Sequence, residues 1–106
     1  MSIPEITPTE FVARRQRGEA LTLLDVREDW ELGVASVPDV VHIPMGSVAD
    51  RLGELDRGQE IVVLCRSGRR SLEVAKLLQQ NGFRTANLAG GILAWSRELD
   101  ATIPTY

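Results

Sequence analysis

Apolar and polar positions follow two alternating patterns along this chain. Short, nearly continuous apolar runs, which are typical of buried β-strands, occupy residues 21–26, 40–43, 61–64 and 85–88. Between these runs apolar residues recur at helical spacing, most clearly Val74, Leu77 and Leu78 within residues 70–80. Other helical segments are predicted over residues 7–18, 29–32, 47–55 and 92–99. Short strands that alternate with amphipathic helices predict an α/β fold with a mostly parallel sheet covered on both faces.

Residue types at the segment ends support these boundaries. Thr7 can cap the first helix, Pro8 suits its first position, and Glu10 completes a capping box. Asn81-Gly82 ends the helix over residues 70–80. The Gly90-Gly91 pair is expected to form a turn that lets the last helix pack closely.

The length and charge of the chain limit its function. Its 106 residues suffice for one domain with a modest core, and no repeat or linker divides residues 1–106. Twelve basic against fifteen acidic residues give a net charge of −3, which argues against nonspecific nucleic-acid binding. Positive charge is instead local, because residues 62–72 hold three arginines and no acidic residue. Such a cluster is expected of a binding site.

The chain has one cysteine, Cys65, which excludes an internal disulfide framework and cannot by itself form a thiolate metal site. We expect neither a metal nor a cofactor. Residues 1–6 carry no apolar signal region, and no segment is long and apolar enough to cross a membrane. These features favour a protein in a reducing, cytoplasmic compartment.

Candidate chemistry follows the predicted strand at residues 61–64. Cys65 ends this strand, a short loop follows, and the next helix begins at about Ser71. The loop N–H groups and the helix N-terminus then face the sulfur, and both favour negative charge there. The thiol should therefore lose its proton more readily than a reference thiol, and the thiolate is the nucleophile. In parallel sheets, ligands bind beyond the carboxyl ends of the strands, where Cys65 lies.

The loop after Cys65 supplies the residues expected to bind a substrate. They are Arg66, Ser67, Gly68, Arg69, Arg70 and Ser71. Three guanidinium groups suit an anionic or sulfur-carrying substrate. Arg69 is the preferred contact because it lies in the middle of the loop, and at least one arginine is expected to make structural contacts instead. Gly68 is expected to adopt a conformation closed to residues with a Cβ atom, so that N–H groups point inward.

Several other polar and aromatic residues are expected to be structural. Asp25, at a strand end, is predicted to accept loop N–H bonds, and Arg27 to pair with a carboxylate. His42 is the only histidine, and its apolar strand predicts a packing role without proton transfer. Trp30 and Trp95 lie in helical patterns and are predicted to belong to the core.

An ordered set of motifs covers nearly the whole chain. It comprises Asp25-Val26-Arg27-Glu28 with Glu31, Val37-Pro38, His42-Ile43-Pro44, Cys65-Arg66-Ser67-Gly68-Arg69-Arg70, and Asn87-Leu88 with Gly90-Gly91 and Trp95. Together they resemble the rhodanese family, in particular its single-domain sulfurtransferases. The resemblance implies a central five-stranded parallel sheet and a cysteine that carries sulfane sulfur as a persulfide. One departure is Ala35-Ser36, where many members have Gly-His, and it affects a turn outside the active loop.

The expected reaction moves sulfur from thiosulfate or a persulfide to cyanide, a thiol or a sulfur-carrier protein through Cys65. The segment 95–106 is also similar to rhodanese domains fused behind enzymes that activate ubiquitin-like sulfur carriers, which suggests such a partner.

Two alternatives remain open from the sequence. A cysteine-loop phosphatase or arsenate reductase needs five residues between the cysteine and an arginine that grips phosphate, but that position is Ser71, and Arg70 follows after four. A non-catalytic binding module often lacks the cysteine, which this chain retains.

Overall fold

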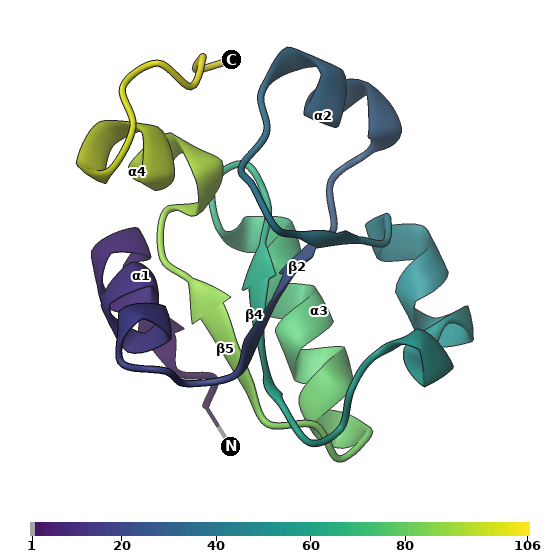
Figure 1. Cartoon of the computed structure of the whole chain (residues 1–106). Helices are drawn as coiled ribbons and strands as arrows, with labels where there is room; N and C mark the ends of the chain where they lie inside the picture. Colours follow the sequence, from purple (N-terminus) through teal and green to yellow (C-terminus); the bar gives the residue numbers. More distant parts are fainter. Residues whose placement is uncertain (1) are drawn as a thin grey trace.

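The architecture is a five-stranded parallel β-sheet with helices on both faces, seen in a computed structural model that describes residues 2–106 (Figure 1). The strand order is β1-β5-β4-β2-β3, and every neighbouring pair runs parallel. The strands are β1 (Glu5–Ile6), β2 (Leu21–Asp25), β3 (Val41–His42), β4 (Glu60–Leu64) and β5 (Thr85–Leu88). The predicted α/β class is therefore confirmed.

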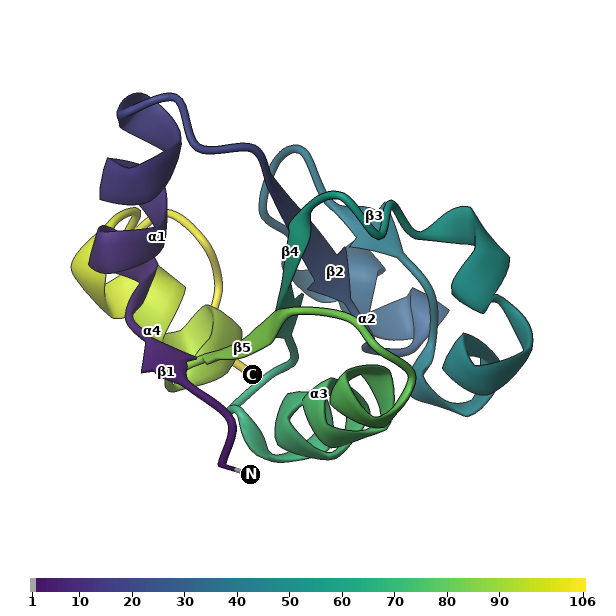
Figure 2. The same cartoon turned by 90° about the horizontal axis from the view of Figure 1, so that it is seen from below.

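The helices divide between the two faces of the sheet. They are α1 (Pro8–Gln16), α2 (Asp29–Val34), α3 (Arg69–Gln80) and α4 (Gly91–Glu98), with two 3-10 helices at Met45–Asp50 and Leu52–Glu54. Figure 2 shows α1 and α4 together on one side of the sheet and α3 on the other. The short α2 lies beyond the ends of β2 and β4, near the C-terminus (Figure 1).

The alternation of side chains along β4 contributes to two apolar layers and determines the face of the sheet on which Cys65 lies. Ile61 and Val63 join the core cluster on the α3 side, whereas Val62 and Leu64 join the cluster that contains Phe11 of α1. Successive side chains of a strand point to opposite faces, so Cys65 continues the row of Ile61 and Val63. The sulfur therefore lies on the face that carries α3. Both faces of β4 are buried over residues 61–64, and these residues form a continuous apolar run.

The local signals for helix ends are mostly confirmed. The Thr7 side chain accepts from the Glu10 backbone N–H at 3.1 Å, and the Glu10 carboxylate accepts from the Thr7 N–H at 3.0 Å, which completes the capping box of α1. The segment predicted as one helix over residues 47–55 instead forms the two 3-10 helices, beginning directly after Pro44. Such short, tight helices are common in connections. The two-residue β1 is an element that the apolar pattern did not reveal.

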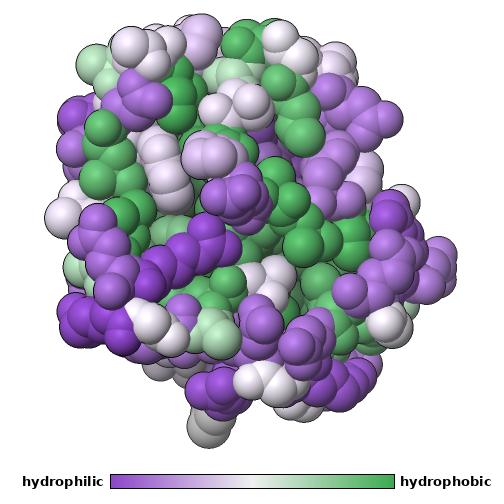
Figure 3. Space-filling model, viewed as in Figure 1, coloured by the Kyte–Doolittle hydropathy of each residue, from purple (hydrophilic) through white to green (hydrophobic). Residues whose placement is uncertain are grey.

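The two tryptophans differ in their environments. Trp95 is buried and its ring centroid lies 6.0 Å from that of Phe11, as predicted for a core residue. The prediction for Trp30 is wrong, because 64% of this residue is exposed. Helix α2 has only six residues and lies at the rim of the fold, so it presents Trp30 outward. Apolar and polar residues are interspersed over the face of the molecule shown in Figure 3. Within residues 2–106, no helix is long and apolar enough to span a bilayer.

Candidate active site

Cys65 lies at the carboxyl end of β4, where several connections converge. The thiol is buried, with 1% of the residue exposed. The backbone carbonyl of Cys65 accepts from the Ile92 N–H at 2.9 Å, and the carbonyl of Arg66 accepts from the Leu93 N–H at 3.2 Å. The first turn of α4 therefore holds the start of the loop.

Gly91 makes that close approach of α4 possible. Its φ is +60°, and a Cβ atom there would collide with the carbonyl oxygens of Cys65 and Arg66. The expectation that the Gly90-Gly91 turn lets the last helix pack closely is confirmed.

The loop aims hydrogen-bond donors at the sulfur. The Gly68 N–H donates to Sγ at 3.0 Å, and the Ser71 Oγ lies 3.2 Å from Sγ. Gly68 has φ of +102° and directly precedes the first residue of α3, so the N-terminus of this helix faces the sulfur. Left-handed backbone of this kind favours glycine, as the sequence predicted.

These donors offset the effect of burial on the pKa of the thiol. Burial raises the pKa of Cys65, but hydrogen bonds from the Ser71 side chain and from the backbone N–H groups of Ser71, Gly68 and Ser67 outweigh it. The pKa of the thiol consequently lies below its ordinary value. The site therefore favours the thiolate, which is the nucleophilic form.

A buried polar cluster lies behind the sulfur. The Ser71 hydroxyl donates to Oδ1 of Asn87 at 2.5 Å. Nδ2 of Asn87 in turn donates to the Gly68 carbonyl at 2.9 Å and to the Glu5 carboxylate at 3.0 and 3.1 Å. Asn87 and Ser71 are both buried, at 2% and 0% exposure. The sequence placed Asn87 in a motif but assigned it no role.

The three loop arginines have different surroundings. Both terminal nitrogens of Arg70 contact the Glu31 carboxylate, at 2.6 and 2.9 Å. This pairing holds the pKa of Glu31 down to about 2, against the opposing effect of burial. Arg70 is therefore an arginine of the loop that makes structural contacts, as expected for at least one of the three. Its predicted contact with a substrate remains a prediction, because both terminal nitrogens already bind Glu31.

The other two arginines face open hollows. Arg66 stacks over the Tyr106 ring, with its guanidinium carbon 5.2 Å from the ring centroid, beside a hollow of about 420 Å³ that Trp30 also lines. Arg69 lines a second hollow of about 410 Å³ with Met45. Among residues 2–106 neither arginine forms an ion pair. They are the cations left available for an anionic ligand.

Asp25 and Arg27 form a buried pair near the site. The Arg27 guanidinium donates to both carboxylate oxygens of Asp25, at 2.8 to 3.1 Å, and the Arg27 backbone N–H also donates to Asp25 at 3.0 Å. Both side chains are essentially inaccessible. These contacts agree with a supporting role.

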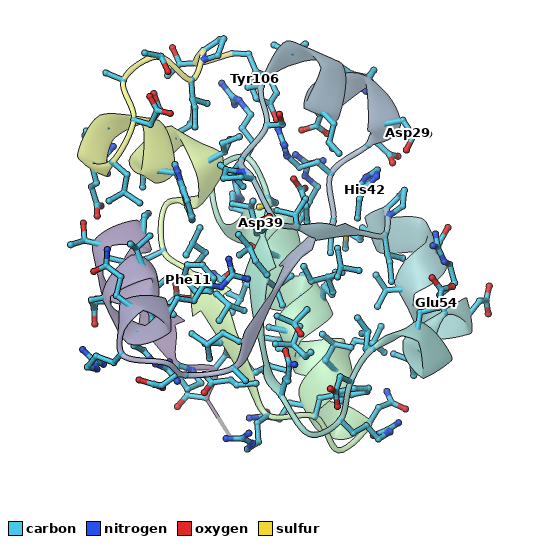
Figure 4. The ribbon with its side chains drawn as sticks, in the orientation of Figure 1. Phe11, Asp29, Asp39, His42, Glu54 and Tyr106 are labelled. Atoms are coloured by element: carbon cyan, nitrogen blue, oxygen red, sulfur yellow. The ribbon has the colours of Figure 1, made fainter. Side chains whose placement is uncertain are left out.

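Tyr106 connects this pair to the active loop, a function that the sequence did not reveal. Its hydroxyl accepts from Arg27 at 2.9 Å and donates to Glu31 at 2.6 Å, and Glu31 holds Arg70. His42 lies on β3, an edge strand of the sheet. Its Nε2 is 2.7 Å from the Arg27 carbonyl, and its ring lies near exposed Asp29, as Figure 4 shows.

Comparisons with known proteins relate this chain to rhodanese-like domains. The family model described as "Rhodanese-like domain" matches residues 7–98. The chain is 42% identical over 98 residues to "Putative sulfurtransferase YtwF" of Bacillus subtilis, covering 92% of this chain and 95% of that one. It is 34% identical to a "Sulfurtransferase" of Allochromatium vinosum, covering 90% of each. A rhodanese-like domain protein from Staphylococcus aureus superposes with a TM-score of 0.84, at 27% identity, over 98% of this chain and 99% of that one.

Proposed function

Because the chain belongs to the rhodanese-like family of sulfurtransferases, we propose that it transfers sulfane sulfur through a persulfide on Cys65. The observation that carries this proposal is a buried sulfur surrounded by N–H donors at the start of α3. Donors placed in this way stabilise negative charge on a sulfur atom, in the thiolate and in a persulfide.

In the first step the Cys65 thiolate attacks the outer sulfur of a donor such as thiosulfate. A bond forms between the two sulfurs, the original S–S bond breaks, and sulfite leaves with its electron pair. The negative charge of the enzyme moves to the terminal sulfur of the new persulfide. The N–H groups of the loop from Arg66 to Ser71 are the donors proposed to surround it. Arg66 and Arg69, which pair with no carboxylate in the part of the chain that the structure describes, supply positive charge for the dianionic donor.

In the second step a nucleophile takes the terminal sulfur. Cyanide would form thiocyanate and return the Cys65 thiolate, so the reaction follows a two-step scheme with a covalent intermediate. Cys65 is buried, which restricts access to small anions, thiols or a narrow chain end. A sulfur-carrier protein or a persulfide donor protein is the proposed macromolecular partner. The exposed Trp30 and the exposed Arg66 of the loop, which line one hollow, are consistent with such a partner.

Intact-mass measurement tests this proposal directly. Wild-type protein treated with thiosulfate should gain the mass of one sulfur atom and should lose it on addition of cyanide. Cys65→Ser should gain none and should show no turnover. Full sulfurtransferase turnover in Cys65→Ser would refute the assignment of the site.

A phosphatase or arsenate reductase is the alternative that the same measurements can separate. Ser71 occupies the position of the arginine that grips phosphate in those enzymes, and Arg70 is engaged by Glu31. Wild-type protein should therefore have little activity on an aryl phosphate. Efficient hydrolysis that is lost in Cys65→Ser would favour the phosphatase. Normal thiol reactivity without any sulfur uptake would favour a binding module.

A further inference from the structure

The hydroxyl of Ser71 lies between two groups that compete for its single proton. On one side is Sγ of Cys65 at 3.2 Å, and on the other is Oδ1 of Asn87 at 2.5 Å. The sulfur needs this proton only when it is a thiolate, because a thiol can donate its own proton to the serine oxygen. The charge of the sulfur and the direction of the hydroxyl are therefore linked.

The orientation of the Asn87 amide is determined by its neighbours. The Gly68 carbonyl and the Glu5 carboxylate lie 2.9 to 3.1 Å from Nδ2, and both are pure acceptors when Glu5 is ionised. The nitrogen of the amide must face them, so its oxygen must face Ser71. Asn87 can only accept from the Ser71 hydroxyl and cannot donate to it.

The contacts close into a ring of hydrogen bonds. With Cys65 as a thiol, Sγ–H donates to Ser71, Ser71 donates to Asn87, Asn87 donates to the Gly68 carbonyl, and the Gly68 N–H donates back to Sγ. Every donor in the ring has an acceptor. Deprotonation of Cys65 turns the Ser71 hydroxyl toward the thiolate and leaves Oδ1 of Asn87, a buried acceptor, without its donor. An unpartnered buried acceptor costs free energy.

We propose that Asn87 is a positioning residue that competes with the Cys65 thiolate for the Ser71 hydroxyl and so opposes deprotonation of the thiol. It acts through Ser71, which with Gly68 supplies the hydrogen bonds to Sγ that the structure shows within residues 2–106. This proposal rests on the proposed function in one respect. In a persulfide the negative charge moves from Sγ to the terminal sulfur, so the hydroxyl returns to Asn87. The buried Oδ1 of Asn87 regains its donor, and this contact favours the loaded form. A thiolate that is less fully stabilised is also the better nucleophile.

Other charged groups around the cluster come from separate elements. Glu5 on β1 contacts Asn87, and Arg70 on α3 acts on Cys65 through space while paired with Glu31 on α2. Arg66 and Arg69 belong to the loop. The substitutions below replace none of these five side chains.

The test is the pH dependence of Cys65 alkylation by iodoacetamide in a double-mutant cycle. Asn87→Ala should lower the midpoint by about one pH unit, because a hydrogen bond to a charged group is worth about 1.5 kcal/mol. Ser71→Ala should raise the midpoint, and Asn87→Ala should no longer lower it in the Ser71→Ala background. Asn81→Ala, which changes an exposed asparagine at the end of α3, is the matched control and should leave the midpoint unchanged.

Several results would overturn the proposal. They are an unchanged or raised midpoint in Asn87→Ala, or the same lowering with and without the Ser71 hydroxyl. Circular dichroism checks folding, and Asn87→Leu, which retains side-chain volume without a hydrogen-bonding group, replaces the alanine variant if that one does not fold. Alkylation uses no sulfur donor, so the role of Asn87 can fail while sulfur transfer stands, and the reverse also holds.

Discussion

At the scale of single residues, Cys65 combines burial with stabilisation of its charge. Burial alone raises the pKa of a thiol, and here the hydrogen-bond donors of Ser71, Gly68 and Ser67 reverse that effect. The folded-state pKa is therefore below that of the unfolded chain, so the thiolate is more abundant in the folded protein at neutral pH.

The first prediction is that alkylation of Cys65 by iodoacetamide has a midpoint below about 8.5, the value of a reference thiol. The same protein unfolded in urea supplies the control, because it retains the sequence and loses the loop. A folded midpoint at or above that of the unfolded protein would contradict the electrostatic account.

A second prediction concerns the contribution of loop charge to substrate binding. Arg69 lines an open hollow and forms no ion pair within the described residues 2–106. Arg69→Ala should therefore raise the KM for thiosulfate about tenfold with little change in kcat, as expected for loss of uniform binding. Steady-state kinetics measure both parameters. Arg84→Ala is the matched control, because Arg84 is exposed and lies just before β5, at the opposite end of the strand from the loop.

Gly68→Ala should affect kcat instead. Its φ of +102° strains any residue with a Cβ atom, although the space around it is sufficient for one. The strain would turn the N–H that donates to Sγ, and it costs of order 1 kcal/mol. An unchanged kcat in Gly68→Ala would contradict the argument from loop shape. An unchanged KM for thiosulfate in Arg69→Ala would contradict the argument from loop charge.

At the scale of elements, α4 supports the active loop from behind. Two N–H groups of its first turn donate to the carbonyls of Cys65 and Arg66 across the contact at Gly91. Helix α3 contributes its N-terminus, and β5 contributes Asn87. Three elements thus determine the position of one loop.

Gly91→Ala should consequently damage both stability and activity. A Cβ atom at Gly91 would force α4 away from the loop, which we expect to lower the free energy of unfolding by about 3 kcal/mol. Gly33→Ala is the matched control, because Gly33 is exposed in α2 with open space around it, and it should be neutral or slightly stabilising. Urea denaturation measures both variants, and equal stabilities would refute the packing argument.

At the scale of the whole molecule, a chain of charged contacts joins remote segments. It runs from Asp25 through Arg27, Tyr106 and Glu31 to Arg70, and so connects β2, α2, α3 and the residues that follow α4. These five residues, here called the charged cluster, tie together the segments that surround the active loop.

Glu31 makes this cluster sensitive to acid. Its folded-state pKa of about 2 lies below its ordinary value, so its stabilisation is complete above about pH 5 and is lost as the pH falls toward 2. Glu31→Gln should lower the free energy of unfolding by about 2 kcal/mol at pH 7. The difference from wild type should shrink between pH 5 and pH 2.

Chemical denaturation at several pH values checks this prediction, and a difference that stays constant with pH would contradict it. Glu54→Gln is the matched control. Glu54 pairs with Arg51 at the surface, far from the cluster, and its loss should change stability little (Figure 4).

The sequence by itself determined the features that depend on neighbouring residues. The apolar run ending at Cys65, the capping box at Thr7 and the left-handed Gly68 follow from local side-chain chemistry, and the structure confirms them. The parallel sheet followed from the alternation of such runs with helices.

Only the tertiary structure decided which residues meet across the fold. The pairing of Arg70 with Glu31 and the contact of Asn87 with Ser71 join residues 39 and 16 positions apart, on different elements. The exposure of Trp30 likewise depends on what packs over α2, and the two-residue β1 exists only because β5 lies beside it. Spacing along the chain carries no direct signal of such contacts, because they arise from the register and packing of segments that only the folded sheet brings together.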